Sequence, residues 1–177
     1  MCAEGVINSL ELGQVSVMAG FQGIAANDRI ATLGRGGSDT SAVALAAAIS
    51  ADRCDIYTDV EGIYTSDPRI VTKAKKLSRI TYEEMLELAS LGAKVLQARS
   101  VELAMNQRVR LQVLSSFIEV SGTLVVDEEE IVEKEIVSGI AHSENEAKIT
   151  LVGVSDNPGI AAGIFGPLAE ANINVDM

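Results

Sequence analysis

The sequence is poor in the residues on which many enzymes and extracellular domains depend. Its 177 residues include two cysteines, one histidine, three prolines and no tryptophan, and aromatic residues make up only 3%. Cys2 and Cys54 are too few for a disulfide framework and lack the spacing of a zinc or redox site, so we expect a reducing cytoplasm. A single histidine, His142, argues against a Ser/His/Asp or Cys/His nucleophilic site and against a transition-metal centre. We therefore expect no metal ligands.

An excess of basic residues and a long apolar run are also missing. The net charge is −11, whereas nucleic-acid and anionic-membrane binders need clustered Lys and Arg. No targeting signal is visible, and the longest apolar run, near residues 42–49, is far too short to span a bilayer. These absences argue against nucleic acid and membrane as partners.

The chain does contain 47% hydrophobic residues, which is ample for a core built from Ala, Val, Ile and Leu. Periodicity predicts, in chain order, a strand at 14–21, a helix at 39–51, a strand at 54–60, a helix from 81 to about 92, a helical stretch at 93–107 and a strand at 110–116. Thr81 and Glu84 have the spacing of a capping box, and Gly92 is expected to end that helix. This alternation predicts an α/β fold with a mainly parallel sheet and flanking helices.

Charge divides the chain into two parts. Residues 1–126 carry 12 basic and 14 acidic side chains, whereas residues 127–177 carry 2 and 11. We interpret the acidic stretch 127–135 as a solvated linker. After it, we expect a strand at 148–154, a turn that leads into a helix at 160–171, and the start of another strand near 173.

A glycine-rich turn, TLGRGGSDTS (32–41), runs directly into the predicted helix at 39–51. Backbone N–H groups and the positive end of the helix dipole would form an anion site there, and Arg35 would add a planar group suited to a carboxylate or phosphate. Alternatively, the glycines only make a tight turn and Ser38 or Asp39 caps the helix. The residues alone leave both interpretations open, because the motif is neither a Walker A loop nor GxGxxG.

A second candidate is the loop YTDVEGIYTSDPR (57–69), which follows a predicted strand. It offers hydroxyls for a ribose or phosphate, an aromatic face for a base and a cation for phosphates. An ordered surface loop with a turn at Asp67-Pro68 would have the same composition. Both loops lie at carboxyl ends of strands, where ligands of such sheets gather.

These blocks carry a family resemblance. TLGRGGSDTSA, DIYTDVEGIYTSDPRIV, YEEMLELASLGAKVL and VLSSF are strongly similar to aspartate kinases of the amino-acid kinase superfamily, in a match that runs from about residue 13 to 117. The resemblance implies the C-terminal, ATP-binding half of a carbamate-kinase-like domain at 1–126. It also implies the reaction of ATP with L-aspartate to give 4-phospho-L-aspartate, the first step of the lysine, threonine and methionine pathway.

The resemblance also implies roles for individual residues. Substrate-binding positions are Arg35, which would hold a carboxylate of aspartate, Gly36, Gly37 and Ser38. Nucleotide-binding positions are Thr58, Asp59, Tyr64, Arg69, Lys94 and Val95. Asp39 and Lys94 would be catalytic, although from the residues alone Lys94 could equally be a solvated helix lysine. Mg²⁺ would be carried by the nucleotide. A carboxylate with a pKa near 4 is already ionised at neutral pH, so no general base is required.

The tail resembles the start of a ferredoxin-like ACT regulatory domain at 136–177. The implied effector site comprises Asp156, Asn157, Pro158, Gly159, Ile160 and Ala161, and the implied effector is lysine or threonine. A plain β-turn-α packing unit is the alternative. ACT units usually pair, so a homo-oligomer is expected.

The chain departs from the family in two places. The Lys-Phe-Gly-Gly-Thr-Ser type segment that opens the kinase domain has no match here, and the ACT unit stops early. We therefore expect a fragment that has negligible kinase activity alone. A non-catalytic nucleotide- or amino-acid-binding regulatory fragment, including a free-standing amino-acid sensor, is the alternative.

Overall fold

The computed structural model describes residues 3–93, 95–131, 137–142, 149–154, 157–173 and 175. The chain forms two compact units, Met1–Glu144 and Asn145–Met177.

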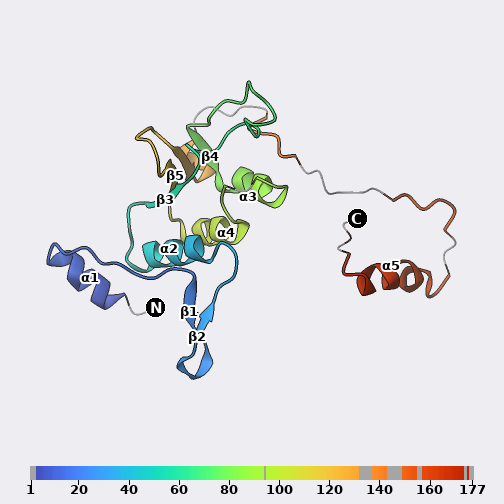
Figure 1. The fold of residues 1–177 in the computed structure, drawn as a ribbon, viewed down its shortest axis with the longest axis horizontal. Helices are drawn as coiled ribbons and strands as arrows, with labels where there is room; N and C mark the ends of the chain where they lie inside the picture. The colour runs from blue at the N-terminus through green and yellow to red at the C-terminus, as the bar shows by residue number, and fades with distance from the viewer. Residues whose placement is uncertain are drawn as a thin grey trace. The chain divides into compact units, whose positions relative to one another are not determined.

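The first unit is built on a four-stranded mixed sheet (Figure 1). Its strands, in spatial order, are β3 (Cys54–Thr58), β5 (Leu111–Ser115), β6 (Thr123–Val126) and β4 (Arg79–Thr81). The β3–β5 and β4–β6 pairs are parallel, whereas β5 and β6 are antiparallel. The short loop 116–122 explains the antiparallel step, because a parallel connection needs a crossover of a dozen or more residues. The expected α/β fold with a mainly parallel sheet is confirmed.

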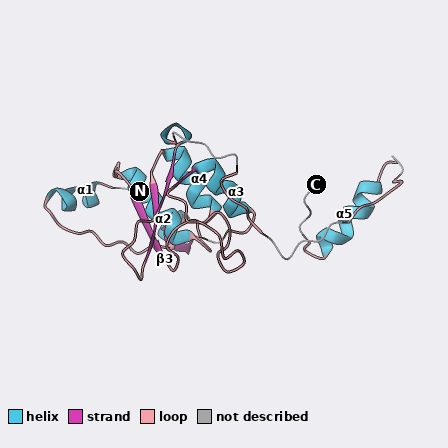
Figure 2. Ribbon diagram, turned by 90° about the horizontal axis from the view of Figure 1, so that it is seen from above, coloured by secondary structure: helices cyan, strands magenta, loops and turns pink. Residues whose placement is uncertain are grey.

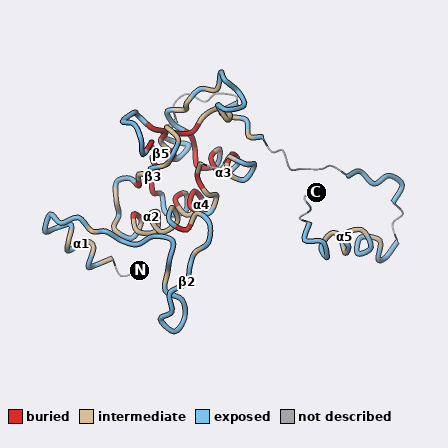
Figure 3. Tube along the Cα trace, viewed as in Figure 1, coloured by how far each residue is buried: buried red, intermediate tan, exposed pale blue. Residues whose placement is uncertain are grey.

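Three helices, α2 (Gly37–Ala48), α3 (Tyr82–Ser90) and α4 (Ala98–Gln107), gather beside the sheet and enclose the core (Figures 1 and 3). Fully buried core side chains from the helices and strands include Val43, Met85, Val101, Leu111, Val113 and Val125. Alternate strand residues such as Tyr57 and Gln112 are exposed or only half-buried. The helices therefore cover one face of the sheet, as the period-2 pattern of the strands requires.

Local sequence explains where the helices start. Thr81 caps α3 by accepting a hydrogen bond from the Glu84 backbone N–H, and the Glu84 carboxylate accepts one from the Thr81 N–H, so the predicted capping box is confirmed. The helical stretch predicted at 93–107 begins only at Ala98. Gly92 has a φ of 113°, and Gln97 is extended, so the chain turns before the helix can start.

The strand predicted at 14–21 is wrong. The chain instead has a helix, α1 (Glu4–Glu11), and a hairpin of β1 (Gln22–Ile24) and β2 (Ile30–Thr32). The alternating pattern was real, but a strand needs a partner for its backbone groups, and no strand among the described residues pairs with 14–21, although the Leu33 N–H donates to the Phe21 carbonyl at 2.9 Å. Asn27 and Asp28 both have positive φ and close the hairpin, as residues of such tight turns do.

The described part of the second unit contains one helix, α5 (Ile160–Glu170), which confirms the helix predicted there (Figure 2). Its N-cap is Gly159, whose φ is 96°. The strand predicted at 148–154 is absent from 149–154, and Ile173 and Val175 lie outside any strand; residues 148, 174, 176 and 177 lie outside the described residues. Apolar side chains of 149–154 are exposed, because the described part of this unit offers no second strand with which they could form a buried sheet face.

No helix in the described part of the chain combines the length and the apolar character needed to cross a membrane.

The buried thiol of Cys54, at the start of β3, should make the free energy of unfolding depend on pH in the alkaline range. Burial, followed by the negative charges of Asp55 and Asp39, raises its pKa from 9.0 to about 11. Above pH 9 the unfolded chain therefore loses this proton while the folded chain keeps it, so the free energy of unfolding falls as pH rises. From about pH 8.5 to 10 the thiol should cost roughly 1 kcal/mol of stability.

Urea unfolding at several pH values checks this effect against Cys54→Ala. Tyr82, whose pKa burial raises to about 12, titrates in the same direction in both proteins and so cancels in the comparison. The variant should lose less stability than the wild type over this interval. Parallel pH profiles would contradict the assignment to Cys54.

Candidate functional site

The glycine-rich turn forms the N-terminal end of α2. Gly34 and Gly36 have φ of 76° and 72°, and the Gly37 N–H donates to the Gly34 carbonyl at 3.0 Å. Gly36 is the N-cap, so Ser38 and Asp39 lie inside the first helical turn and neither is the capping residue. The alternative in which one of them caps the helix is therefore wrong. The helix N-terminus remains suited to an anion, because an N-cap without a side chain offers no capping oxygen to the N–H groups that follow Gly37.

A side chain from α4 holds this turn in place. The Arg99 guanidinium donates from Nη2 to the carbonyl oxygens of Leu33 at 3.0 Å and Arg35 at 2.8 Å. Gln97 packs so closely on Gly36 that a Cβ there would lie 2.0 Å from its Cγ. Sequence reasoning missed Arg99 and Gln97 as supports, since they lie more than 60 residues further along the chain from Leu33 and Arg35.

A shallow pocket of about 210 Å³ opens beside the turn. Its lining residues are Arg35, Ala89, Gly92, Ala93, Leu96 and Gln97. Arg35 therefore lines the same pocket as the loop 92–97, which contains the predicted nucleotide contacts Lys94 and Val95. Val95 is half-buried against the core, whereas Lys94 lies outside the described residues.

Asp39 is half-buried in the first turn of α2, and burial raises the pKa of its carboxyl group. The next two residues use their hydroxyls locally: Thr40 donates to the Gly36 carbonyl at 3.1 Å and Ser41 to the Gly37 carbonyl at 2.8 Å. Asp39 is thus the carboxylate of this turn, and it stands where the helix dipole favours negative charge.

The second candidate segment begins where β3 ends. Thr58 is paired in register with Ser115, so the carboxyl ends of the parallel strands β3 and β5 meet. The Thr58 hydroxyl donates to the Asp59 carboxylate at 3.1 Å, and its carbonyl accepts from the Ser116 N–H at 2.8 Å. The five-residue connection 49–53 reverses the chain between α2 and β3, so the N-terminus of α2 faces the same edge of the sheet.

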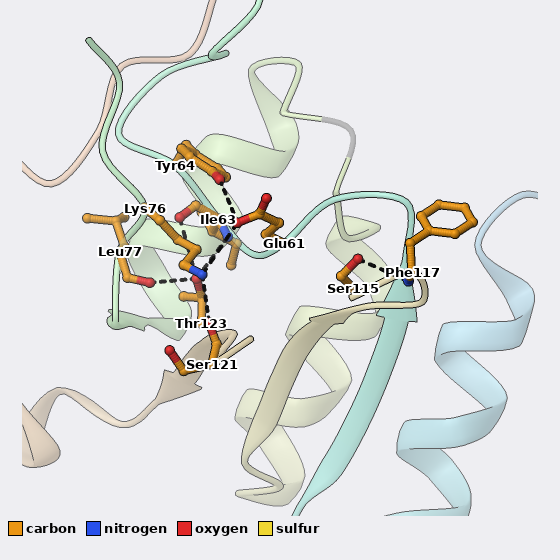
Figure 4. A network of polar contacts seen from close by, with 9 residues as sticks. All are labelled: Glu61, Ile63, Tyr64, Lys76, Leu77, Ser115, Phe117, Ser121 and Thr123. Atoms are coloured by element: carbon orange, nitrogen blue, oxygen red, sulfur yellow. Dashed lines mark hydrogen bonds and ion pairs between the residues drawn. The ribbon is translucent and has the colours of Figure 1, made fainter. Parts of the chain in front are cut away.

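Tyr64 lies in a polar network at the base of the loop that follows (Figure 4). Its hydroxyl donates to the Glu61 carboxylate at 3.5 Å, and its backbone forms an antiparallel bridge with Lys76. Lys76 also forms an ion pair with Glu61, with Nζ and Oε2 3.7 Å apart. Burial, together with the charge of Glu61, raises the pKa of Tyr64, which therefore stays a neutral donor at physiological pH.

Arg69 is held by its neighbour Asp67. Nη2 and Nε donate to the two carboxylate oxygens at 2.7 and 3.1 Å, and the Arg69 backbone N–H donates to the same group at 2.8 Å. These hydrogen bonds lower the pKa of Asp67. The Arg69 side chain is still 86% exposed, so it could meet a phosphate without leaving the loop. The segment can therefore form the expected turn at Asp67-Pro68 and still present the Arg69 cation to an anionic ligand.

The predicted effector residues lie in the second unit. Asn157, Pro158 and Gly159 precede α5, and the Ile160 N–H donates to the Asn157 carbonyl at 3.3 Å. Ala161 follows in the first turn, whereas Asp156 lies outside the described residues. This turn at a helix N-terminus is of the kind that receives carboxylates.

Within the described residues, no three His, Cys, Asp or Glu side chains are grouped as metal ligands. The two candidate segments of the first unit offer hydroxyls, an exposed arginine, a glycine-rich helix N-terminus and the carboxylates of Asp39 and Asp59. Such a set can bind and orient two anions but contains no histidine or thiolate nucleophile, which suits phosphoryl transfer between already ionised groups.

Comparison with known proteins agrees with this chemistry. Residues 2–115 match the model of the amino acid kinase family. The chain is 57% identical over 176 residues to an aspartate kinase of Stutzerimonas stutzeri, and 59% identical over 170 residues to an aspartokinase of Pseudomonas aeruginosa. These matches cover 99% and 95% of this chain but 43% and 41% of the relatives. The chain therefore spans about two fifths of the length of these curated relatives.

Solved structures of aspartokinases are also similar to this chain. Aspartokinase III of E. coli in complex with aspartate and ADP is 36% identical, with a TM-score of 0.70, over 99% of this chain and 39% of that one. The same enzyme with lysine and aspartate is 34% identical, also with a TM-score of 0.70, over 99% of this chain and 40% of that one. UMP kinase of Bacillus anthracis is 18% identical with a TM-score of 0.57, over 72% of this chain and 52% of that one, a likeness of fold alone.

Proposed function

Because the chain belongs to the amino acid kinase family, we propose that it supplies nucleotide- and substrate-binding parts of an aspartate kinase. Such an enzyme transfers the γ-phosphoryl group of ATP to the side-chain carboxylate of L-aspartate. The observation that carries the proposal is the 57–59% identity to aspartate kinases over at least 95% of the chain. UMP kinases share the fold at much lower identity, so uridylate is the less suitable acceptor.

In this reaction the acceptor needs no activation by a base. A carboxylate with a pKa near 4 is ionised at neutral pH and can attack the γ-phosphorus directly. The protein must instead hold two anions together in line. We assign the pocket beside Arg35 to a carboxylate of aspartate, because Arg35 lines it and directly precedes Gly36, the N-cap of α2. Gly36, Gly37 and Ser38 let the backbone approach the same ligand.

We assign the nucleotide to the edge where β3 ends. Thr58 and Asp59 would bind ribose or phosphate, Tyr64 would donate from its neutral hydroxyl, and Arg69 would pair with phosphate oxygens. Lys94 and Val95 would add contacts from the loop before α4. Asp39 would orient cationic groups around the transferred phosphoryl group, a role that its position in the first turn of α2 supports.

Mg²⁺ would supply charge neutralisation on the transferred phosphoryl group. We propose that the ion arrives already bound to the ATP phosphates.

We further propose that residues 136–177 belong to an ACT regulatory unit whose effector is lysine or threonine. The turn at Asn157 to Gly159, which opens α5, supports a site for an amino-acid carboxylate. The lysine complex of E. coli aspartokinase III makes lysine the first effector to test. Pairing of such units would make the assembly a homo-oligomer, and the two cysteines without disulfide spacing suit the cytoplasm.

Calorimetric titration of the chain with ADP and with aspartate tests the proposal. Arg69→Ala should weaken ADP binding about tenfold, because a charge-assisted contact with phosphate is lost. Arg53→Ala is the matched control: Arg53 is also an exposed arginine paired with an aspartate two residues away, Asp55, yet it precedes β3 and lies outside the proposed site. ADP binding that is undetectable, or equally weakened in both variants, would contradict the assignment.

A further inference from the structure

We propose that Thr123, on β6, is a positioning residue for the nucleotide. Its hydroxyl would hold the base of the loop 63–77, which carries Tyr64 and Arg69, in the place where these side chains can bind. The inference rests on the proposed function and deepens it. It assigns a role to a strand whose sequence contains none of the residues expected to touch ATP.

The Thr123 hydroxyl joins both ends of the loop (Figure 4). It accepts a hydrogen bond from the Ile63 N–H at 2.8 Å and donates one to the Leu77 carbonyl at 2.6 Å. The Leu77 N–H in turn donates to the Ile63 carbonyl at 2.8 Å. Thr123 is 0% exposed, so water cannot replace these hydrogen bonds.

A second link connects the same loop to the residues just before β6. Lys76 donates from Nζ to the Ser121 carbonyl at 2.7 Å and pairs with the Glu61 carboxylate at 3.7 Å. The Tyr64 hydroxyl donates to this carboxylate as well. The Tyr64 hydroxyl is therefore linked, through the side chains of Glu61 and Lys76, to the residues just before β6.

Gly62 shows how tightly the chain passes over this hydroxyl. Its φ of 150° disfavours other residues, and a Cβ there would lie 2.6 Å from Thr123 Oγ1 and 3.2 Å from Lys76 Cδ. A residue with a Cβ at position 62 would therefore overlap with the Thr123 hydroxyl. A change in the Thr123 side chain would be transmitted directly to Ile63 and Tyr64.

Outside Thr123 and Lys76, the loop is tied to another segment through Thr65, whose carbonyl accepts a hydrogen bond from the Ile140 N–H at 2.8 Å. Pro68, Arg69, Ile70 and Val71 are exposed, and the hydrogen bonds between Thr65 and Lys75 join only the two arms of the loop to each other. The position of Arg69 relative to the sheet is therefore set near the base of the loop, by Thr123, Lys76 and the hydrogen bond between Ile140 and Thr65.

A threonine could instead serve only the stability of the core. The two roles differ in their effect on binding. A loss of folded protein weakens the apparent affinities for ADP and aspartate by the same factor, since both ligands need the folded chain. Misplacement of the loop weakens ADP binding alone, because the proposed aspartate site at Arg35 belongs to the turn before α2.

Titration of Thr123→Val and Thr123→Ser with ADP and with aspartate tests the role. The isosteric valine should raise the Kd for ADP about tenfold and leave that for aspartate within about twofold. Serine keeps the hydroxyl and should restore ADP affinity to within about threefold of the wild type. Thr72→Val, at an exposed position in the same loop, is the matched control and should bind both ligands normally.

Lys76→Met provides a second test should Thr123→Val fail to fold, since methionine keeps most of the apolar stem while the ammonium is lost. It should also weaken ADP selectively. The role of Thr123 would be overturned by unchanged ADP affinity in Thr123→Val, or by an equal loss of ADP and aspartate affinity in it. Failure of Thr123→Ser to restore ADP affinity would also overturn it. A wild-type chain that binds no ADP would overturn the proposed function and this inference together.

Discussion

Replacement of Gly36 by alanine should lower the free energy of unfolding by about 2–4 kcal/mol and abolish aspartate binding. Gly36 has a φ of 72°, a conformation that costs an alanine roughly 1 kcal/mol. In addition, the new Cβ would lie 2.0 Å from Gln97 Cγ and 2.6 Å from its Cβ. These atoms are close to the backbone of the N-cap of α4, so relief requires the turn and α4 to move apart.

Gly34→Ala separates the two causes. Gly34 has nearly the same φ, 76°, but a Cβ there would meet only Arg99 Nη2, at 4.0 Å. This variant should therefore lose only about 1 kcal/mol, the cost of the backbone conformation. Urea unfolding of both variants, with aspartate titration at a temperature where each is folded, measures the difference. Equal losses would show that the contact with Gln97 is unimportant.

Gly122→Ala should be more damaging still, with a loss of more than about 3 kcal/mol. A Cβ on Gly122 would lie 1.8 Å from the Val113 carbonyl oxygen and 2.8 Å from its carbon. Both atoms belong to the backbone of β5, whose Val113 pairs with Thr123. The overlap therefore cannot be relieved by a side-chain rotation and would disrupt the antiparallel step at the centre of the sheet.

Gly23→Ala is the matched control, because Gly23 is also a glycine of a paired segment but has room for a Cβ. Gly23 lies in β1, and a Cβ there would meet only Leu33 Cδ2 at 3.6 Å, an ordinary contact. Its unfolding free energy should stay within about 0.5 kcal/mol of the wild type. If Gly122→Ala unfolds at the same urea concentration as the wild type, the close approach of β5 and β6 is not required for the fold.

Elements with strong local signals could be predicted from the sequence. The capping box at Thr81 and Glu84 marks the start of α3, and the run after Pro158 marks α5, because hydrogen bonds within a helix join residues close in sequence. The buried strands β3 and β5 also show as apolar runs between turn residues. Composition and alternation were therefore enough for the α/β class.

Strands without local partners could not be predicted reliably. The alternating patterns at 14–21 and 148–154 indicate chains able to form strands, yet none of their described residues lies in one, whereas the three-residue β4 and four-residue β6 were missed. A strand is stabilised by hydrogen bonds to another segment, which can lie anywhere along the chain. Period-2 patterning measures the tendency and not the partner.

The candidate site divides in the same way. The turn at Gly34 to Asp39 and the loop at Thr58 to Arg69 are contiguous in sequence, so their residue types and spacing were sufficient to identify the family and the expected chemistry. Arg99 and Thr123 reach these two segments from about 60 residues away. Their importance comes from buried or paired hydrogen bonds that exist only once the chain has folded, because sequence distance carries no information about which side chain will lie beside a given backbone carbonyl.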